Sequence, residues 1–117
     1  MPEKSPKRAV KSALVVTAIF LFLFLVVRSN IARADDAAAL FKAKCAMCHG
    51  PDGGGDTPTG KMMKAADLKS ADVQKAPDSE FADAITKGRN KMPAVGKAFK
   101  PDEVKGLVAF VRALAKK

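Results

Sequence analysis

Two cysteines and a histidine stand together in the sequence Cys45-Ala46-Met47-Cys48-His49. They are the only cysteines and the only histidine among the 117 residues. Thiols and an imidazole can ligate a metal, form a disulfide, carry out thiol redox chemistry or hold a prosthetic group covalently. Any such chemistry in this chain that uses these side chains is therefore confined to this short segment.

The spacing C-x-x-C-H is that of an attachment site for a c-type haem. Two thiols three positions apart near a helix end reach the two vinyl groups along one edge of a porphyrin. The adjacent imidazole then points at the iron from the same face. The sequence therefore predicts one c-type haem, with thioether bonds from Cys45 and Cys48 and with His49 as the proximal iron ligand.

Three other interpretations of the motif are weaker. A structural zinc site needs four nitrogen or sulfur ligands, and the chain offers two cysteines and one histidine. A thioredoxin-like redox motif belongs in a βαβ pattern, and no strand-like alternation of useful length is present. A disulfide between Cys45 and Cys48 is possible in an oxidising compartment, but it gives His49 no role.

The first 34 residues have the composition of a secretory signal peptide. Residues 1–12 are basic and polar, residues 13–27 carry no charge, and Ala32-Arg33-Ala34 offers small residues before a cleavage point. The apolar run is shorter than the roughly 20 residues that usually span a membrane. We expect cleavage after Ala34, and the alternative is retention as an N-terminal anchor.

Residues 35–117 are enough for one small domain, and such a domain often needs a cofactor for stability. It carries 15 basic and 11 acidic residues, so the net charge of +9 for the whole chain owes much to the leader. The lysines are interspersed with acids, and the chain has no tyrosine or tryptophan. A nucleic-acid partner is therefore not expected.

The pattern predicts an all-α fold. Asp35-Asp36 before an alanine-rich stretch reads as a helix start, and residues 50–60 read as loop. A short turn is expected after Ser70 and a helix from Pro77 to Gly88. Residues 89–100 read as irregular, and Pro101 opens a last helix with an apolar stripe. The stripe consists of Val104, Leu107, Val108, Val111 and Leu114.

Over residues 37–117 the chain resembles the small bacterial and photosynthetic class I cytochromes c. The similarity rests on four features: Phe41 four residues before the motif, the motif itself, Lys91-Met92-Pro93-Ala94, and the pair Leu107 and Phe110. It implies that the N- and C-terminal helices cross over a covalently bound haem. It also implies that a backbone carbonyl from the loop before Pro58 accepts the second N–H of His49. The family usually has glycine at the position of Ala37, which predicts a slightly wider crossing here.

The distal iron ligand is expected to be Met92, as the resemblance implies. His and Met together are a common ligand pair in electron-transfer cytochromes. Met47 lies within the attachment motif, and Met62 and Met63 read as apolar cover over the haem edge. Met92 follows His49 by 43 residues, ample chain to reach the far face of a haem. The alternative is that Met92 only fills a gap in the core.

The sequence thus predicts a soluble, exported, monomeric one-electron carrier rather than an enzyme, located in a periplasm or a thylakoid lumen. Its expected partners are redox proteins, chiefly membrane-bound complexes. Two alternatives remain: a haem domain with an open distal site, peroxidase-like or gas-binding, and a membrane-tethered subunit of a larger oxidoreductase. Seven lysines form either a basic rim for an acidic partner or an ordinary solvated surface: Lys42, Lys44, Lys61, Lys64, Lys87, Lys91 and Lys97.

Overall fold

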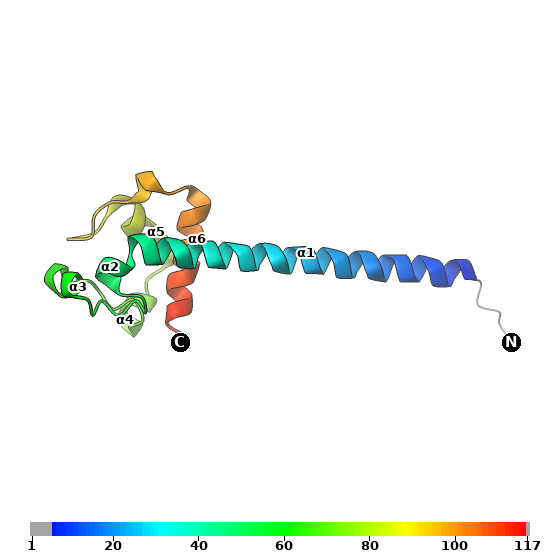
Figure 1. Cartoon of the computed structure of the whole chain (residues 1–117), viewed down its shortest axis with the longest axis horizontal. Coiled ribbons are helices and arrows are strands. Elements are labelled where there is room, and N and C mark those ends of the chain that lie inside the picture. The colour runs from blue at the N-terminus through cyan, green and yellow to red at the C-terminus, as the bar shows by residue number, and fades with distance from the viewer. Residues whose placement is uncertain (1–5, 117) are drawn as a thin grey trace. The chain divides into compact units, whose positions relative to one another are not determined.

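A computed structural model describes residues 6–116 of the chain, with residues 6, 8 and 30–32 described by their backbone alone (Figure 1). Its helices are α1 (Pro6–Lys44), α2 (Ala46–His49), α3 (Pro58–Met63), α4 (Ala71–Gln74), α5 (Asp78–Lys87), a 3₁₀ turn η1 (Gly96–Ala98) and α6 (Pro101–Leu114). Within the described range the only β-type pairing is an isolated bridge between Arg89 and Met92. The predicted all-α class is confirmed. Residues 1–5 of the expected leader lie outside the described residues, as does Lys117.

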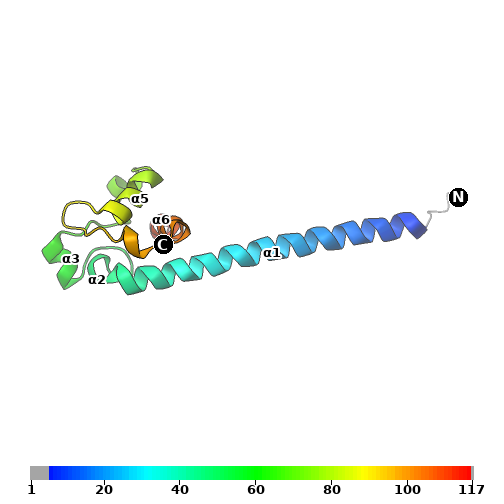
Figure 2. The same cartoon turned by 90° about the horizontal axis from the view of Figure 1, so that it is seen from above.

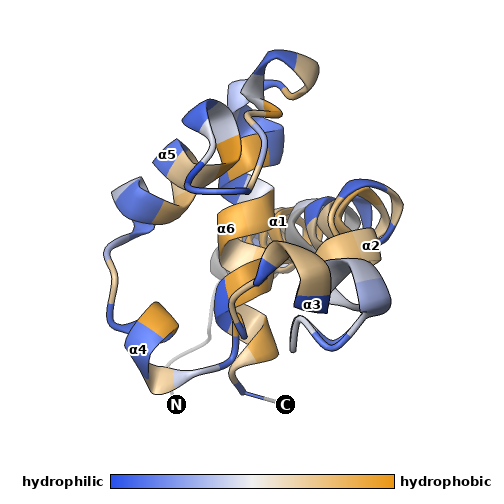
Figure 3. Ribbon diagram, turned by 90° about the vertical axis from the view of Figure 1, so that its left-hand side faces the viewer, coloured by the Kyte–Doolittle hydropathy of each residue, from blue (hydrophilic) through white to orange (hydrophobic). Residues whose placement is uncertain are grey.

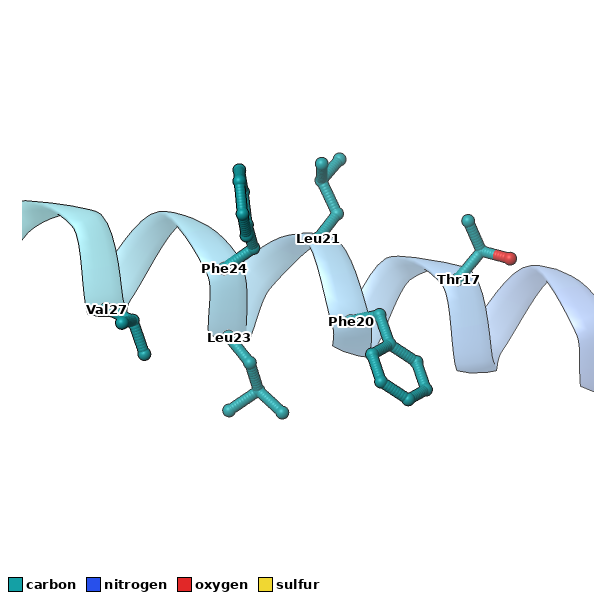
Figure 4. A pocket seen from close by; sticks show the side chains of 6 residues that line it. All are labelled: Thr17, Phe20, Leu21, Leu23, Phe24 and Val27. Atoms are coloured by element: carbon teal, nitrogen blue, oxygen red, sulfur yellow. The ribbon is translucent and has the colours of Figure 1, made fainter.

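The chain divides into two compact units, residues 1–33 and residues 34–117. In the first unit the large apolar side chains between Val10 and Val27 are 44–71% exposed. Figure 4 shows six side chains that project from this helix: Thr17, Phe20, Leu21, Leu23, Phe24 and Val27. By length and composition α1 can cross a membrane, and an N-terminal signal sequence meets the same criterion.

The predicted helix start at Asp35 is wrong, because α1 runs without a break from Pro6 to Lys44. No proline or glycine occurs between residues 7 and 49, so nothing in the sequence interrupts the helix there. The two acids that resemble an N-terminal signal therefore lie on the exposed surface of a continuing helix.

Within the second unit, the end of α1 packs against α6. The rings of Phe41 and Phe110 lie 4.9 Å apart between centroids, and Leu107 is 1% exposed. Ala37 is also buried, and a Cβ added to Gly106 of α6 would lie 3.4 Å from its side chain. The small residue that permits close approach thus stands on α6 rather than on the first helix. Helix α6 has 14 residues, a length that is marginal for an isolated helix in water, so its stability depends on this packing.

Helix α5 completes the core on another side of α6 (Figure 2). Phe81 and Ile85 from α5 join the apolar stripe of α6 in one buried cluster. Figure 3 shows hydrophobic residues along α6 where it lies beside α5. The helices predicted from Pro77 and Pro101 are confirmed at their starts, and Ser70 caps α4 by accepting a hydrogen bond from the Val73 amide.

Arg112 ties the chain before α5 to α6. Its guanidinium donates hydrogen bonds to the backbone carbonyls of Gln74 and Ala76. Its Nε lies 2.8 Å from a carboxylate oxygen of Asp78, and its Cζ lies 4.4 Å from the ring centroid of Phe81. Because the Asp78 side chain is 73% exposed, the ion pair itself adds little, and the two carbonyl bonds carry most of the effect.

We predict that Arg112→Ala lowers the free energy of unfolding of the purified protein by about 2–3 kcal/mol, since it removes charge-assisted bonds and leaves two carbonyls without their donor. Guanidinium chloride unfolding measures this change. The matched variant Asp78→Asn removes only the exposed charge and should cost less than about 1 kcal/mol. Equal losses of unfolding free energy in the two variants would contradict the conclusion that the two carbonyl bonds carry most of the effect of Arg112.

Candidate haem site

The attachment motif begins where α1 ends. The Cys45 amide donates to the Phe41 carbonyl at 2.8 Å, and the next four residues form the single turn α2. Gly50 ends this turn with φ of +76°, a conformation that favours glycine. Because Phe41 is held against α6, the start of the motif is fixed by the crossing of these two helices. The structure therefore brings Cys45, Cys48 and His49 together on one short element.

Helix α3 packs directly against α2 through Thr57. The Thr57 hydroxyl donates to the carbonyls of Met47 and Cys48 at 2.8 and 3.1 Å, and its oxygen accepts from the Gly60 amide at 2.8 Å. A Cβ on Gly60 would lie 2.2 Å from the Cys48 carbonyl oxygen, so only glycine allows this approach. Thr57 thus supports the backbone of the motif.

The expectation that residues 50–60 are all loop is wrong for the last three, which open α3. A signal for this start was present in the sequence. Thr57 is a favoured N-cap residue, and Pro58 occupies the first helical position, where its missing N–H costs nothing. The run of glycines before Thr57 and Pro58 favours a loop, so this helix start was not predicted.

The loop between α2 and α3 is anchored at two points. Asp52 pairs with Lys69 at 2.6 Å, and the hydrogen bond from that lysine lowers the pKa of the carboxyl. The Leu68 amide donates to the Gly53 carbonyl at 2.8 Å. A Cβ on Gly53, whose φ is +78°, would lie 2.7 Å from Leu114, so the loop closes onto the end of α6.

The His49 imidazole is held with one nitrogen inside the protein. Among the described residues, its Nδ1 is the only buried side-chain nitrogen or oxygen without a hydrogen bond. Burial lowers the pKa of His49, and the backbone carbonyl of Ala66 opposes this by raising it. The hydrogen bond expected from a carbonyl of the loop before Pro58 is not formed in this structure. Nε2 is then the nitrogen available to a metal, as a neutral imidazole ligand requires.

Cys45 and Cys48 form no disulfide with each other, and both are half-buried. Burial raises the pKa of Cys45, and the neighbouring Cys48 raises it further. Redox-active and nucleophilic cysteines have lowered pKa values, so the environment does not favour a thiol redox function.

Burial around the motif suits a large apolar prosthetic group. Between residues 45 and 80 the only fully buried residues are the glycines at positions 50, 53, 55 and 60. The larger apolar side chains there, such as Leu68 and Val73, are half-buried at the border of the core cluster. Together with the thiol pair and the imidazole, this pattern fits a haem held by Cys45, Cys48 and His49.

Met92 lies on a different segment, after α5. It is partly buried and packs against the same core cluster as Cys45. By contrast Met47 is 73% and Met62 71% exposed.

Comparison with known proteins shows the family to which this chain belongs. The family described as "Cytochrome C oxidase, cbb3-type, subunit III" matches residues 32–111. Cytochrome c6 of Nostoc sp. is 33% identical over 102 residues, covering 85% of this chain and 87% of the relative. The chain belongs to the cytochrome c family. Two further relatives support this. Cytochrome c6 of Rippkaea orientalis is 32% identical over 104 residues, covering 86% of this chain and 90% of the relative. Cytochrome c6 of Aphanizomenon flos-aquae is 34% identical over 74 residues, covering 63% of this chain and 82% of the relative.

Membership of the cytochrome c family confirms the resemblance inferred from the sequence. The protein carries one c-type haem, and it is an electron-transfer protein rather than an enzyme. The interpretations of the motif as a zinc site, a bare disulfide or a thiol redox pair are thereby set aside.

We predict that Thr57→Val lowers the free energy of unfolding of the haem-loaded cytochrome by about 2 kcal/mol, because it removes an N-cap and a hydroxyl bond to the motif. Thr57→Ser keeps both interactions and should lie within about 0.5 kcal/mol of the parent. Denaturant unfolding of the two variants provides the measurement. If valine is tolerated as well as serine, Thr57 does not support the motif.

Proposed function

We propose that residues 35–117 form a soluble one-electron carrier in which His49 and Met92 are the axial ligands of the haem iron, with Cys45 and Cys48 as its covalent attachment points. One observation carries the choice of Met92. Of the four methionines after residue 34, it alone packs against the buried core cluster that the motif also borders. A thioether held at the core suits a ligand that must stay in place as the iron changes charge.

The bound haem supplies a one-electron couple between Fe(III) and Fe(II). The protein contributes fixed ligands, and a His/Met pair raises the reduction potential relative to ligation by two histidines. With both axial positions held by these side chains, the iron would offer no open site to a peroxide or a gas. This distinguishes the carrier from the alternative of an open distal site.

Residues 1–34 are proposed as a signal peptide that directs export and is cleaved after Ala34. The exposed apolar surface between Val10 and Val27, behind a basic start, supports this assignment. The mature carrier would then work in a periplasm, with a thylakoid lumen as the alternative. A tethered subunit of a larger oxidoreductase is the competing interpretation, and it requires the leader to be retained.

The proposed partners are membrane-bound redox complexes with acidic docking surfaces. Of the seven lysines in the predicted basic rim, Lys61 and Lys87 are paired with Asp56 and Asp83. The other five are exposed and form no ion pair with any described residue. Unpaired charges of one sign raise the rate of encounter with an acidic surface.

We predict that Met92→Ala abolishes the weak far-red absorption band of Fe(III)–sulfur ligation and converts the oxidised cytochrome to a high-spin or water-ligated form. Absorption spectroscopy of the purified ferric protein measures this. Met62→Ala and Met63→Ala are matched controls that remove a methionine elsewhere, and both should retain the band. Retention of the band in Met92→Ala would assign the distal ligand to another residue.

We predict that the native protein begins at Asp35. Intact-mass analysis of the cytochrome purified from the soluble exported fraction should show a chain of residues 35–117 plus one haem. A chain that retains residues 13–27 and partitions with membranes would instead establish the tethered form.

A further inference from the structure

The segment that carries Met92 is closed by a pair of reciprocal hydrogen bonds. The Arg89 amide donates to the Met92 carbonyl at 3.1 Å, and the Met92 amide donates to the Arg89 carbonyl at 2.9 Å. These bonds form the isolated bridge noted above and leave two residues, Asn90 and Lys91, at the tip. The backbone at Met92 is therefore set by the dihedral angles of these two residues.

Asn90 adopts the left-handed conformation, with φ of +54°. It and Lys64 are the only residues other than glycine with positive φ among those the structure describes. Its side chain is exposed and makes no hydrogen bond to any described residue. Asparagine tolerates this conformation better than most residues, whereas a β-branched residue does not. The backbone angle, rather than a side-chain contact, thus accounts for asparagine at this position.

The chain on both sides of the bridge is held against α5. Before it, a Cβ on Gly88 would lie 2.7 Å from the Met92 carbonyl oxygen and 2.9 Å from the Ala94 nitrogen. After it, the Val95 amide donates to the Ile85 carbonyl at 3.0 Å. Because both flanks are fixed, the neighbouring residues cannot change conformation to relieve an unfavourable φ at residue 90 while Met92 stays in place.

We propose that Asn90 is a positioning residue for the distal ligand: its left-handed backbone sets the tight turn that presents Met92, and the stability of iron–sulfur ligation depends on it. The inference rests on the proposed role of Met92. Asn90 itself is assigned no contact with the haem or the iron. Exchange of the Met92 sulfur for another iron ligand would free the turn to open, and the backbone at residue 90 could then change its angle. Strain at residue 90 therefore weakens ligation specifically.

The test is competition with free imidazole, which displaces a methionine sulfur from ferric iron by forming an iron–nitrogen bond in its place. At fixed pH, titration of the haem-loaded ferric cytochrome with imidazole gives an apparent dissociation constant that rises with the strength of Met92 ligation. Forcing a β-branched residue into the left-handed region should weaken that ligation about tenfold. Asn90→Val should therefore bind imidazole about tenfold more tightly than the parent.

Two variants control for conformation and position. Asn90→Gly adopts the same angle without strain and should bind imidazole within about twofold of the parent. Lys91→Val places the same side chain at the adjacent exposed residue, which lies outside the left-handed region, and should also stay within about twofold. If Asn90→Val folds poorly, Asn90→Ala provides a milder strain of the same kind, with an expected change of about threefold to tenfold.

The outcomes separate this inference from the proposed function. If Met92→Ala loses the far-red band but Asn90→Val binds imidazole like the parent, Met92 is the ligand and Asn90 does not position it. Asn90 is equally excluded from this role if Lys91→Val and Asn90→Val change imidazole binding equally, or if Asn90→Val lowers only the unfolding midpoint. If Met92→Ala keeps the band, the proposed ligand is wrong and the inference falls with it.

Discussion

The contact between the end of α1 and α6 is the interaction on which the site depends. The Phe41 ring lies against that of Phe110 and belongs to the same buried cluster as Leu107. The Cys45 amide donates a hydrogen bond to the Phe41 carbonyl four residues before it. The attachment motif therefore begins at a point set by the crossing. The same helix α6 carries the buried stripe that meets α5, and the Met92 turn follows α5 along the chain. Helix α6 thus positions both proposed axial ligands: His49 through the end of α1, and Met92 through α5.

The distribution of burial divides the second unit into two parts with different requirements. The buried apolar side chains come from the end of α1, from α5 and from α6. The segment from residue 45 to residue 80 buries only glycines, and its backbone is held by Thr57, the Gly53–Leu68 bond and the Asp52–Lys69 pair. A domain of this size has little apolar surface to bury, so a covalently held haem adds both chemistry and core volume.

Much of this organisation follows from short-range sequence signals. The motif, the starts of α5 and α6, the Ser70 cap and the pairing of Phe41 with Leu107 and Phe110 could all be predicted, because each depends on local spacing or on one apolar stripe. The continuity of α1 through Asp35 and the helix at Pro58 were missed, since acids and glycines also occur where no helix begins or ends. Other features depend on residues far apart in the sequence. Arg112 meets carbonyls 36 and 38 residues away. The glycine at the helix contact is Gly106 on α6, opposite Ala37, whereas the related cytochromes usually have their glycine at position 37.

The central claim is that protein side chains fill both axial positions of a single haem, so that the cytochrome carries electrons and binds no substrate at iron. An optical redox titration of the purified holoprotein, repeated under carbon monoxide, tests it most directly. We expect one reversible one-electron transition of a low-spin haem, unchanged by carbon monoxide. A high-spin spectrum, or a reduced form that binds carbon monoxide readily, would contradict the claim.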